Sequence, residues 1–593
     1  MNTRRIESDL TVVGGGIAGL CAALSAARQG LRVTLVECRD VLGGNASSEN
    51  RVHMNGAGNA SHSYYAREGG IADEIKLTVF HQNPRYNFKD DYELSDMALL
   101  SLALAEENLT LFLGTAVNEV RTEGGRVCEV YGYRHRTEEH FVFSSPLFAD
   151  ASGDGVVAAA AGAKFRHGRE AQSEFDEPLA EEEGDPYTMG SSILFTVGRA
   201  DHPIPFVAPA FAYDYKKDGI LPYCERPETG RSLPKKLDGV DGIWWLSTGG
   251  MDNTVTDHEK IDLELKKLVY GFFDYVKNSG DYENTENYYL KWVASAPAKR
   301  ESRRFEGDYM ISQRDLADQT DFPDAVATGG WSLDIHDPGG IYGAGKTSKF
   351  GPIHGMYNIP YRIMYTRDIE NLFLCGRIVS ATHVALGSLR VMQTLGAMAQ
   401  AVGTAAVLCR REGLLPRDIN RPDLMRELQE RLVRDGQYIA GRREDVGLAA
   451  DARISASATA AFENTHTDHL FPLTRAYALA LPVPSGRLES VELALHNESD
   501  EPRSLHLRLC ASYAQDTYET AEQLAELTLV LPPRADGFFP AVFNCKDIPN
   551  SLALIHFDAA QDVSFYATKQ HITGAPCFFV HNGKISNRFT DAY

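Results

Sequence analysis

Cysteine is scarce and dispersed in this sequence, and no Cys-x-x-Cys pair occurs. The nine cysteines are scattered over 593 residues, and the two closest in sequence are Cys21 and Cys38. This spacing excludes zinc ribbons, iron–sulfur ligation by this chain and a local redox dithiol, and it gives no candidate metal ligands. Because an odd number of scattered cysteines is typical of reduced thiols, we expect a cytoplasmic protein.

Positive charge and long apolar runs are also scarce. Lysine and arginine together number 59, against 81 aspartates and glutamates, which gives a formal net charge of −22. An acidic surface repels phosphate backbones and anionic lipid headgroups, so we expect neither nucleic acid nor a membrane surface as a partner. No uninterrupted apolar run approaches the ~18 residues of a membrane helix, and Val156–Ala163 is among the longest. We therefore expect no membrane insertion, and the N-terminal residues lack the apolar stretch of a secretion signal.

The composition is otherwise that of an ordinary globular protein, with 43% hydrophobic and 24% charged residues. Disordered, collagen-like and coiled-coil architectures are therefore excluded. At about 150 residues per domain, the length corresponds to three or four structural units.

A strand, a glycine-rich turn, a helix and a second strand follow one another at the start of the chain. The apolar strands are residues 9–13 and 31–37, and the Ala- and Leu-rich helix between them, residues 20–29, ends at Gly30. Apolar strands without alternation are typical of parallel sheets that are buried on both faces. The first 37 residues therefore predict one βαβ unit.

The turn of this unit has the pattern Gly14-x-Gly16-x-x-Gly19, and Glu37 ends the second strand. In this context Gly14 permits the tight turn, Gly16 lets the backbone approach a pyrophosphate, and Gly19 lets helix and strand pack closely. The helix N-terminus faces the phosphates, and the Glu37 carboxylate can accept both ribose hydroxyls. The unit therefore predicts a dinucleotide site rather than an ordinary glycine turn.

A second small-residue loop favours FAD over NAD. The pair Gly43-Gly44 comes six residues after Glu37 and is followed by Asn-Ala-Ser-Ser at residues 45–48, so backbone and short hydroxyls can reach the far side of the cofactor. The order Gly-x-Gly-x-x-Gly, Glu, Gly-Gly resembles the fingerprint of two-dinucleotide-binding-domain flavoproteins. Residues 148–155 and 371–377 are similar to that superfamily's second strand-and-turn motif and to its flavin-closing segment. We therefore predict FAD, bound without a covalent link.

Three further stretches look like the family labelled FAD-dependent oxidoreductase or xanthan lyase-like, namely residues 51–53, 300–309 and 376–383. The resemblance covers roughly residues 8–415. It implies a flavin domain with an inserted substrate domain, as in the more distant fumarate reductase and succinate dehydrogenase flavoproteins. It also implies that the cofactor is contacted by Gly14, Gly16, Ala18, Gly19, Glu37, Cys38, Arg39, Gly44, Asn45, Ser47, Ser48, Val117, Ala151, Ser152, Gly153, Asp154, Gly376, Arg377, Gly387 and Leu395.

The patterns after the first βαβ unit predict the rest of the fold. We expect helices at residues 95–107 and 257–278, and a hairpin that turns at Gly124-Gly125. Past residue 451 only short alternating strands occur, and they predict an antiparallel sandwich at 490–496, 504–510, 525–531, 552–557 and 563–567.

The predicted fold class is α/β: a Rossmann-like FAD-binding domain with an inserted α+β substrate domain and a C-terminal antiparallel β-sandwich. The expected boundaries are 1–165 and 356–450 for the two parts of the FAD-binding domain, 166–355 for the inserted substrate or cap domain, and 451–593 for the sandwich.

Residues 340–347 match the Walker A pattern of a P-loop letter for letter. A working P-loop needs a hydrophobic strand before it and a helix after it. Here Asp-Pro-Gly precedes the pattern, and Gly351 and Pro352 interrupt any helix that follows. We therefore reject ATP binding and interpret the segment as a glycine-rich loop, which can serve as a lid over the substrate.

Flavin oxidation of a C–H bond needs a base for the accompanying proton and cations where charge develops. The candidate bases are His53, His336 and His383, although each can instead hydrogen-bond backbone near a cofactor. Residues 387–390, Gly-Ser-Leu-Arg, resemble the Gly-x-x-Arg that borders the flavin in fumarate-reductase-type enzymes. There the arginine helps to hold substrate, which makes Arg390 the first active-site candidate.

A second group of arginines has two interpretations. Arg300, Arg303 and Arg304 can bind anionic groups of a substrate, or they can form internal salt bridges with Glu301, Glu306 and Asp308. The predicted catalytic residues are accordingly His383, Arg390, His53 and Arg300.

The leading functional hypothesis is an FAD-dependent dehydrogenase or oxidase that acts on a small polar molecule such as a sugar derivative or hydroxy acid. The alternative is a flavin-dependent reductase of an activated alkene such as an unsaturated carboxylate, and a third option is a non-catalytic flavin-bearing scaffold. The electron acceptor stays unknown, and a homo-oligomer is possible. The C-terminal sandwich is either a structural element, which we favour, or a module that binds carbohydrate or a partner.

Overall fold

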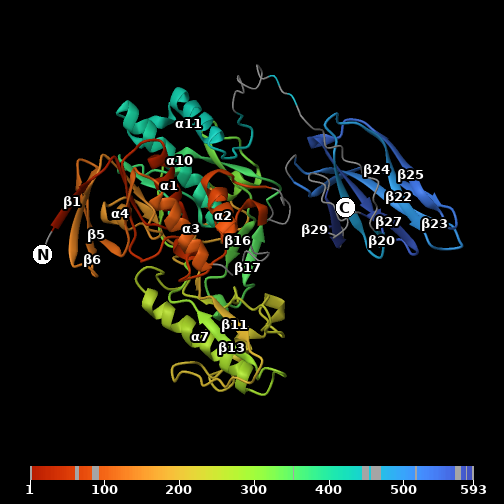
Figure 1. Ribbon diagram of the computed structural model, residues 1–593, viewed down its shortest axis with the longest axis horizontal. Helices are drawn as coiled ribbons and strands as arrows, with labels where there is room; N and C mark the ends of the chain where they lie inside the picture. Colours follow the sequence, from red (N-terminus) through yellow and green to blue (C-terminus); the bar gives the residue numbers. More distant parts are fainter. Residues whose placement is uncertain are drawn as a thin grey trace. The chain divides into compact units, whose positions relative to one another are not determined.

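The computed structural model describes residues 3–59, 66–82, 92–351, 353–443, 453, 455, 469–514, 517–567, 576–581 and 584–589. The chain forms two compact units (Figure 1). The first contains residues 1–56, 67–352 and 357–444, and the second contains residues 57–66, 353–356 and 445–593. The finer division of the first unit into a cofactor domain and an inserted domain stays a prediction.

The centre of the first unit is a five-stranded sheet in which all neighbouring strands are parallel. Its strands, in spatial order, are β19 (Leu372–Leu374), β8 (Leu147–Asp150), β2 (Leu10–Val13), β3 (Val33–Val36) and β4 (Leu109–Phe112). Every residue of β2, β3, β8 and β19 is buried, as expected for a sheet covered on both faces. Because the strands are parallel, the turns after β2, β3, β8 and β19 all leave the same edge of the sheet, where ligands of such folds bind.

Helix α1 (Ile17–Arg28) packs on this sheet, and a second helix, α10 (Met392–Glu412), packs closely on α1. Helix α1 follows β2, as predicted. A Cβ at Gly403 of α10 would lie 2.4 Å from the carbonyl oxygen of Ala22, so the two backbones approach each other closely. By length and composition α10 is apolar enough to cross a membrane, but 94% of its apolar window is buried inside the structure. Its hydrophobicity is therefore explained by its place in the core.

A second sheet, in the order β1-β7-β6-β5, contains the predicted hairpin. Strands β5 (Thr115–Glu123) and β6 (Arg126–Arg134) pair antiparallel around Gly124-Gly125, and β7 (Glu139–Ser144) continues the sheet. Strand β1 (Thr3–Glu7) was not predicted. It is polar and exposed, and only its parallel pairing with β7 makes it a strand.

Helix α7 (His258–Asn278) is the longest of the remaining helices of the first unit and agrees with the helix predicted there. Its buried face packs into a separate core with β11 (Phe195–Arg199) and β13 (Tyr288–Val293). The other helices are α2 (Gly70–Gln82), α3 (Tyr92–Leu104), α4 (Val156–Ala160), α5 (Gln172–Phe175), α6 (Leu221–Cys224), α8 (Gln313–Ala317), α9 (His383–Leu389) and α11 (Pro422–Arg434). The short strands are β9 (Phe165–Arg166), β10 (Ser191–Ser192), β12 (Ser247–Thr248), β14 (Arg304–Phe305), β15 (Ala325–Gly329), β16 (Leu333–His336), β17 (Ser348–Gly351) and β18 (Tyr357–Pro360).

The second unit is the predicted antiparallel sandwich. One sheet has the order β20-β27-β22-β25 and the other the order β24-β23-β26-β21-β28-β29. The strands are β20 (His469–Pro472), β21 (Tyr477–Pro482), β22 (Leu488–Asn497), β23 (Arg503–Ser512), β24 (Thr520–Leu531), β25 (Asp536–Cys545), β26 (Leu552–Phe557), β27 (Val563–Ala567), β28 (Cys577–His581) and β29 (Lys584–Phe589). Leu495 of the first sheet and Leu507 and Ile555 of the second belong to one buried core, which holds the two sheets together.

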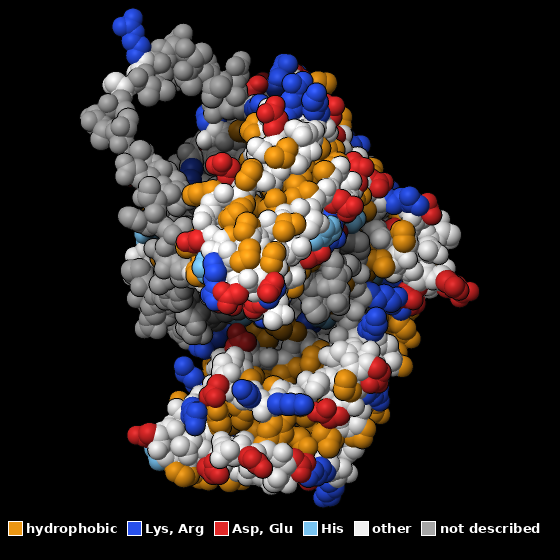
Figure 2. All heavy atoms as spheres, turned by 90° about the vertical axis from the view of Figure 1, so that its right-hand side faces the viewer, with side chains coloured by type: hydrophobic (Ala, Val, Ile, Leu, Met, Phe, Trp, Pro, Cys, Tyr) orange, Lys and Arg blue, Asp and Glu red, His pale blue; other side chains and the backbone are white. Residues whose placement is uncertain are grey.

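The surface of the sandwich is mixed in character. Figure 2 shows hydrophobic side chains interspersed with polar and charged ones. The largest exposed hydrophobic side chains of β24 and β25 are Val530, Phe538 and Val542. Most aromatic side chains of the sandwich pack against its core instead. The role of this unit, structural or ligand-binding, stays a prediction.

Candidate functional site

The glycine turn between β2 and α1 packs directly on the turn after β8. Gly14 has a φ of +106°, and a Cβ there would lie 2.2 Å from the carbonyl oxygen of Ala151. A Cβ at Gly19 would lie 1.8 Å from the carbonyl oxygen of Gly14. Both positions therefore require glycine for backbone packing, in the way the sequence pattern predicts.

Gly16 and Gly44 lie close to each other at the N-terminus of α1. The nearest atom to a Cβ built on Gly16 is the Cα of Gly44, at 3.9 Å, and the two loops are joined by a hydrogen bond from the Gly43 amide to the Gly15 carbonyl (2.8 Å). No side chain caps α1 and its first turn has no acidic residue. The backbone amides at this uncapped helix N-terminus are therefore suited to bind a diphosphate.

Glu37 directly follows β3, lies beside this turn and is 5% exposed. Its Oε2 accepts a hydrogen bond from the Gly15 amide (2.5 Å), and its Oε1 accepts one from the Arg39 amide (2.8 Å) and one from the Cys38 thiol (3.2 Å). The carboxylate thus fixes the loop that would line the ribose. Its contact with the ribose hydroxyls stays a prediction.

The loop at residues 44–48 is held by its own side chains. Asn45 donates to the carbonyl of Lys299 (3.1 Å), Ser47 donates to the carbonyl of Gly44 (2.8 Å), and the Ser48 hydroxyl donates to Asp96. These hydroxyls already have protein acceptors, so the backbone is the part of this loop best placed to meet a cofactor.

Asp154 links the other two motifs that resemble flavoproteins. It accepts from Lys299 (2.6 Å) and from Arg377 (3.0 Å), and the side chain of Arg377 lies over Gly153. Burial raises the pKa of Asp154, but Arg377 and Lys299 outweigh it and lower the pKa to about 2. Asp154 and Arg377, both predicted to contact the cofactor, therefore form an ion pair with each other.

The other predicted cofactor residues lie near these turns or in the surrounding core. The Ser152 hydroxyl donates to the buried Asp150 (2.6 Å), and a Cβ at Gly376 would lie 3.6 Å from that of Ala18. Val117 lies in β5 and Leu395 in the first turn of α10. Gly387 packs α9 on β16, because a Cβ there would lie 3.2 Å from the carbonyl oxygen of Asp334.

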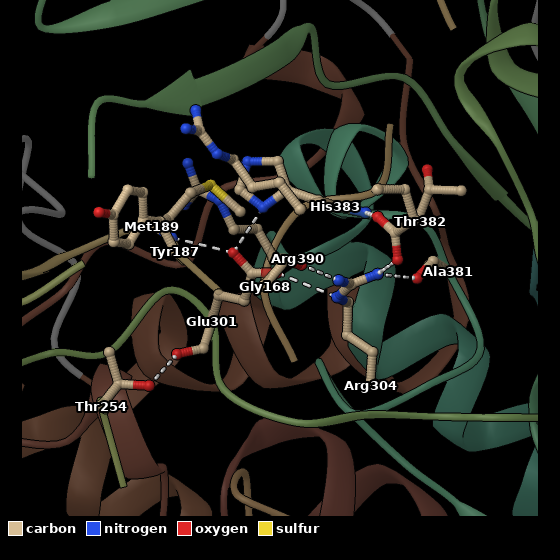
Figure 3. Close-up of polar contacts among 12 residues, drawn as sticks. Gly168, Tyr187, Met189, Thr254, Glu301, Arg304, Ala381, Thr382, His383 and Arg390 are labelled. Carbon is tan, nitrogen blue, oxygen red and sulfur yellow. Dashed lines mark hydrogen bonds and ion pairs between the residues drawn. The ribbon is translucent and has the colours of Figure 1, made fainter. Parts of the chain in front are cut away.

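His383 begins α9 and belongs to a closed ring of buried charges (Figure 3). Its Nδ1 lies 2.8 Å from Oε2 of Glu301, which also accepts from the Met189 amide (2.9 Å). Arg304 pairs with Glu301 (3.0 Å) and with Glu170 (2.6 Å). The ring closes where Glu170 accepts from the backbone amide of His383 (2.9 Å).

This ring determines the state of the imidazole. A carboxylate can only accept, so Nδ1 of His383 carries the proton when Glu301 is ionised. Burial raises the pKa of Glu301, but His383, Arg304 and the Met189 amide together lower it below its usual value. The Nε2 atom is buried and has no hydrogen-bond partner among the described residues. A neutral His383 therefore presents an unused acceptor at Nε2.

The three arginines of the 300–304 segment have different environments. Arg304 forms internal ion pairs, as one of the two sequence interpretations proposed, and Arg303 donates to the carbonyl of Asp154 (3.0 Å). Arg300 is 7% exposed and donates to the Gly190 carbonyl (2.8 Å), to the Ser192 hydroxyl (2.9 Å) and to the Trp244 carbonyl (3.3 Å).

Arg390, the residue after α9, pairs with Asp334 of β16 (2.9 Å). The same carboxylate contacts Nε2 of His336 (3.2 Å) and accepts from the Ser348 hydroxyl (2.5 Å). Burial and the nearby Arg300 lower the pKa of His336 to about 4, against the opposing effect of Asp334. His336 is therefore neutral near pH 7.

His53, the remaining predicted base, lies at the Trp244 side of the site. Its Nε2 is 3.2 Å from Asp241, and its ring centroid is 6.2 Å from that of Trp244, whose carbonyl accepts from Arg300. The structure thus connects His53 to Arg300 through Trp244, and His336 to Arg390 through Asp334.

The segment that resembles a P-loop joins β16 to β17 and is followed by a strand rather than a helix. The fully buried Arg231 donates to the carbonyls of Gly340 (2.7 Å) and Gly345 (3.0 Å). This geometry agrees with the rejection of a P-loop. A lid role stays a prediction.

Sequence reasoning missed three side chains that organise the site: Glu301 as the partner of His383, Glu170 as the acceptor at the start of α9, and Asp334 as the link between Arg390 and His336. Their partners lie 82, 213 and 56 residues away in the chain. The sequence has no local spacing that reports such contacts. The only sequence signal of an internal charge network was the acidic residues that stand beside the arginines in segment 300–309.

Comparison with known proteins identifies a family. The family model described as FAD dependent oxidoreductase matches residues 9–432. This range contains every site residue named above and ends before β20.

Matches to individual proteins are shorter or more distant. The chain is 55% identical over 42 residues to hydroxyneurosporene desaturase of Rhodobacter capsulatus, which is 7% of this chain and 8% of that protein. It is 37% identical over 59 residues to dihydrolipoamide dehydrogenase of Chaetomium thermophilum, which is 10% of this chain and 12% of that protein. A solved geranylgeranyl bacteriochlorophyll reductase-like protein of Thermoplasma acidophilum is 12% identical, with a TM-score of 0.34, over 73% of this chain and 85% of that chain. The chain thus spans about an eighth or less of the length of the two curated relatives.

Proposed function

The chain belongs to the FAD dependent oxidoreductase family, and on this premise we propose that it transfers a hydride between a small polar organic substrate and FAD. The observation that supports this proposal most directly is the buried pair of His383 and Glu301, with the unused Nε2 of His383. Oxidation at a C–H bond next to a hydroxyl needs a proton acceptor for that hydroxyl.

Bound FAD supplies the two-electron acceptor for the hydride. The backbone of Gly16 and Gly44 would hold its phosphates, and Glu37 would hold its ribose. The segments joined by the Asp154–Arg377 ion pair would also line the cofactor. Gly16 fits this assignment because it carries no side chain that would stand between a diphosphate and the first amides of α1.

In the proposed oxidation the substrate C–H bond breaks with its electron pair, and the hydroxyl proton passes to Nε2 of His383. The substrate becomes a carbonyl compound. Glu301 holds the ring in the tautomer that leaves Nε2 able to accept, and its negative charge stabilises the imidazolium that results.

The charges around His383 favour this proton transfer. The ring holds one arginine, Arg304, against two carboxylates, Glu301 and Glu170. Arg166 lies farther out, 3.9 Å from Glu170, and shares its charge with Glu174 and Glu306. A positive charge on His383 therefore brings the ring closer to neutrality.

The alternative function is reduction of an activated alkene such as an unsaturated carboxylate. Arg300 and Arg390 favour it, because cations near the flavin can hold a carboxylate. In that direction hydride goes to the alkene, and a protonated His383 supplies the proton to the neighbouring carbon.

An anaerobic experiment separates the two directions. Oxidised holoprotein is mixed with hydroxy compounds, and dithionite-reduced holoprotein is mixed with enoates, while flavin absorbance is recorded. Bleaching by a hydroxy compound supports the proposal, whereas reoxidation by an enoate alone supports the alternative. Acid precipitation of the same sample tests the predicted non-covalent FAD, since the flavin should then appear in the supernatant.

A further inference from the structure

Arg300 is a buried cation whose partners within the structure are all neutral. Its guanidinium donates to two carbonyls and one hydroxyl, those of Gly190, Trp244 and Ser192. Among the described residues no carboxylate lies within ion-pair distance of it. Burying a charge without a counter-ion is costly, so a buried guanidinium of this kind favours an anionic ligand.

The neighbouring charges leave this cation uncompensated. Burial and then the repulsion of Arg390 lower the pKa of Arg300 to about 9, and only Asp334 opposes them. Asp334, however, is already paired with Arg390 (2.9 Å). Arg390 and Asp334 thus neutralise each other, and one positive charge, that of Arg300, remains. A singly charged carboxylate balances it, whereas a doubly charged phosphate would overcompensate.

Arg390 still has a donor available next to this charge. Its Nη2 atom is bonded to Asp334, while its Nε is buried and has no partner among the described residues. Arg390 therefore offers an unused hydrogen-bond donor to an anion that the charge of Arg300 attracts.

Two buried imidazole nitrogens are hydrogen-bond acceptors, in contrast to the arginine donors. Nε2 of His336 donates to the carboxylate of Asp334 (3.2 Å), so Nδ1 carries a lone pair, and this atom is buried without a partner in the described part of the chain. Nε2 of His383 is likewise buried and has no hydrogen-bond partner among the described residues. Two unused acceptors favour a ligand with O–H donors, which an ionised unsaturated carboxylate does not have.

These groups lie on elements that pack together. His383 and Arg390 are seven residues apart at the two ends of α9, on the same side of the helix, and α9 packs on β16, which carries His336. Arg300 adjoins Glu301, the partner of His383, and the two contact the adjacent residues Gly190 and Met189. Figure 3 shows His383, Arg390, Glu301 and Met189 in one close group.

We propose that Arg300, assisted by Nε of Arg390, binds the carboxylate of a small hydroxy acid whose hydroxyl groups donate to His336 and His383. This assignment rests on the proposed hydride transfer for the reaction, but the binding site is defined by its own charges and acceptors. It selects the hydroxy acid among the substrates that the proposed function allows.

Binding to the holoprotein, followed by readouts other than flavin bleaching, tests this inference separately from the hydride transfer. The ligands are three hydroxy acids (glycolate, glycerate and gluconate), their neutral counterparts (ethylene glycol, glycerol and sorbitol) and their hydroxyl-free counterparts (acetate, propionate and hexanoate). Melting temperature and calorimetric titration are the readouts, under anaerobic conditions. At least one hydroxy acid should bind about tenfold or more tightly than both of its counterparts, because each counterpart lacks either the charged or the hydroxyl contact.

Variants assign the binding to the arginine. Arg300→Gln should weaken binding of the hydroxy acid about tenfold or more. Arg300→Lys keeps the charge but not the planar guanidinium, so its affinity should lie between those of the wild type and Arg300→Gln. Arg126→Gln, on an exposed arginine paired with Glu370, is the matched control and should bind as the wild type does. The comparison among ligands on the wild-type protein needs no variant, so it stands even when Arg300→Gln does not fold.

The inference is wrong if no hydroxy acid exceeds its neutral counterpart, if hydroxyl-free acids bind equally well, or if Arg300→Gln binds as the wild type does. Its failure is distinguishable from failure of the proposed function. Arg300-dependent binding without flavin bleaching leaves the inference standing and overturns the hydride transfer. Bleaching by neutral sugars that is independent of Arg300 does the reverse.

Discussion

Nδ1 of His383 lies 2.8 Å from Oε2 of Glu301, and both side chains are buried. The two residues come from different motifs of the sequence and are 82 positions apart. Their contact gives the site an oriented imidazole with one nitrogen committed to the carboxylate and the other unused. It also means that a change at Glu301 alters His383 without touching the substrate.

Glu301→Gln should therefore slow substrate-dependent flavin reduction roughly 10- to 100-fold, because the imidazolium loses its neighbouring negative charge. The acid limb of the rate–pH profile should move to lower pH, since His383 then holds a proton less strongly during the reaction. Stopped-flow reduction at several pH values measures both effects. Glu259→Gln, on an exposed residue of α7, is the control. A lower rate with an unmoved acid limb would assign Glu301 a structural role only.

The two glycines of the first turn should respond differently to alanine. Gly16→Ala places a methyl group 3.9 Å from the Cα of Gly44, an ordinary contact distance, at a backbone φ of −62°, so it should weaken FAD binding and leave the melting temperature of the apoprotein unchanged. Gly19→Ala drives a methyl group against the Gly14 carbonyl, so it should destabilise the apoprotein by about 1–3 kcal/mol. FAD titration and thermal melting of both apoproteins make the comparison. Equal loss of stability in the two variants would contradict the difference between an unstrained methyl group at position 16 and a clashing one at position 19.

Acid should destabilise the ligand-free protein partly through His336. Its pKa is about 4 in the fold and near 6.5 when unfolded, because burial and Arg300 outweigh Asp334. The unfolded chain thus binds the extra proton first, so stability is complete above about pH 6.5 and falls as the pH drops towards 4. The difference is worth roughly 3 kcal/mol.

His336→Gln should accordingly flatten the dependence of the free energy of unfolding on pH between about 6.5 and 4. Urea unfolding of the first unit, followed at several pH values, measures this slope. His202→Gln is the matched control, because the His202 side chain is 70% exposed. An unchanged slope in His336→Gln would mean that His336 is not buried in its neutral form.

The sandwich has its own core, and Leu507 lies fully buried in it. Leu507→Ala should destabilise this unit by about 2–5 kcal/mol, since it removes buried contacts and leaves a cavity. Calorimetry should show a lower sandwich transition while the release of FAD, followed by fluorescence, stays at the wild-type temperature. Val530→Ala, on a side chain that is 64% exposed, is the control. Earlier FAD release in Leu507→Ala would show that the two units unfold together.

Much of the fold could be predicted because its signals are local. The buried strands β2 and β3 are continuous apolar runs, the glycine turn has a fixed spacing, and the sandwich strands alternate regularly. Strand β1 could not be predicted in this way, because Thr3–Glu7 is polar and exposed and depends on β7 for its pairing.

The site was predictable as a set of residues and not as a set of contacts. His383, Arg390 and Arg300 stand in recognisable motifs, but their environments depend on side chains far away in the chain. Arg300 and Arg304 are four residues apart, yet only Arg304 meets carboxylates. That difference is decided by how the segments at 170, 190 and 334 fold around them, and sequence spacing does not report it.

The most direct test of the account is anaerobic single-turnover reduction of the bound FAD by a hydroxy acid, in the wild type and in His383→Gln. We predict bleaching of the flavin in the wild type and a rate about 100-fold or more lower in His383→Gln, with the same FAD content in both. An unchanged rate in His383→Gln, or reoxidation of reduced flavin by enoates with no reduction by any hydroxy compound, would contradict the account.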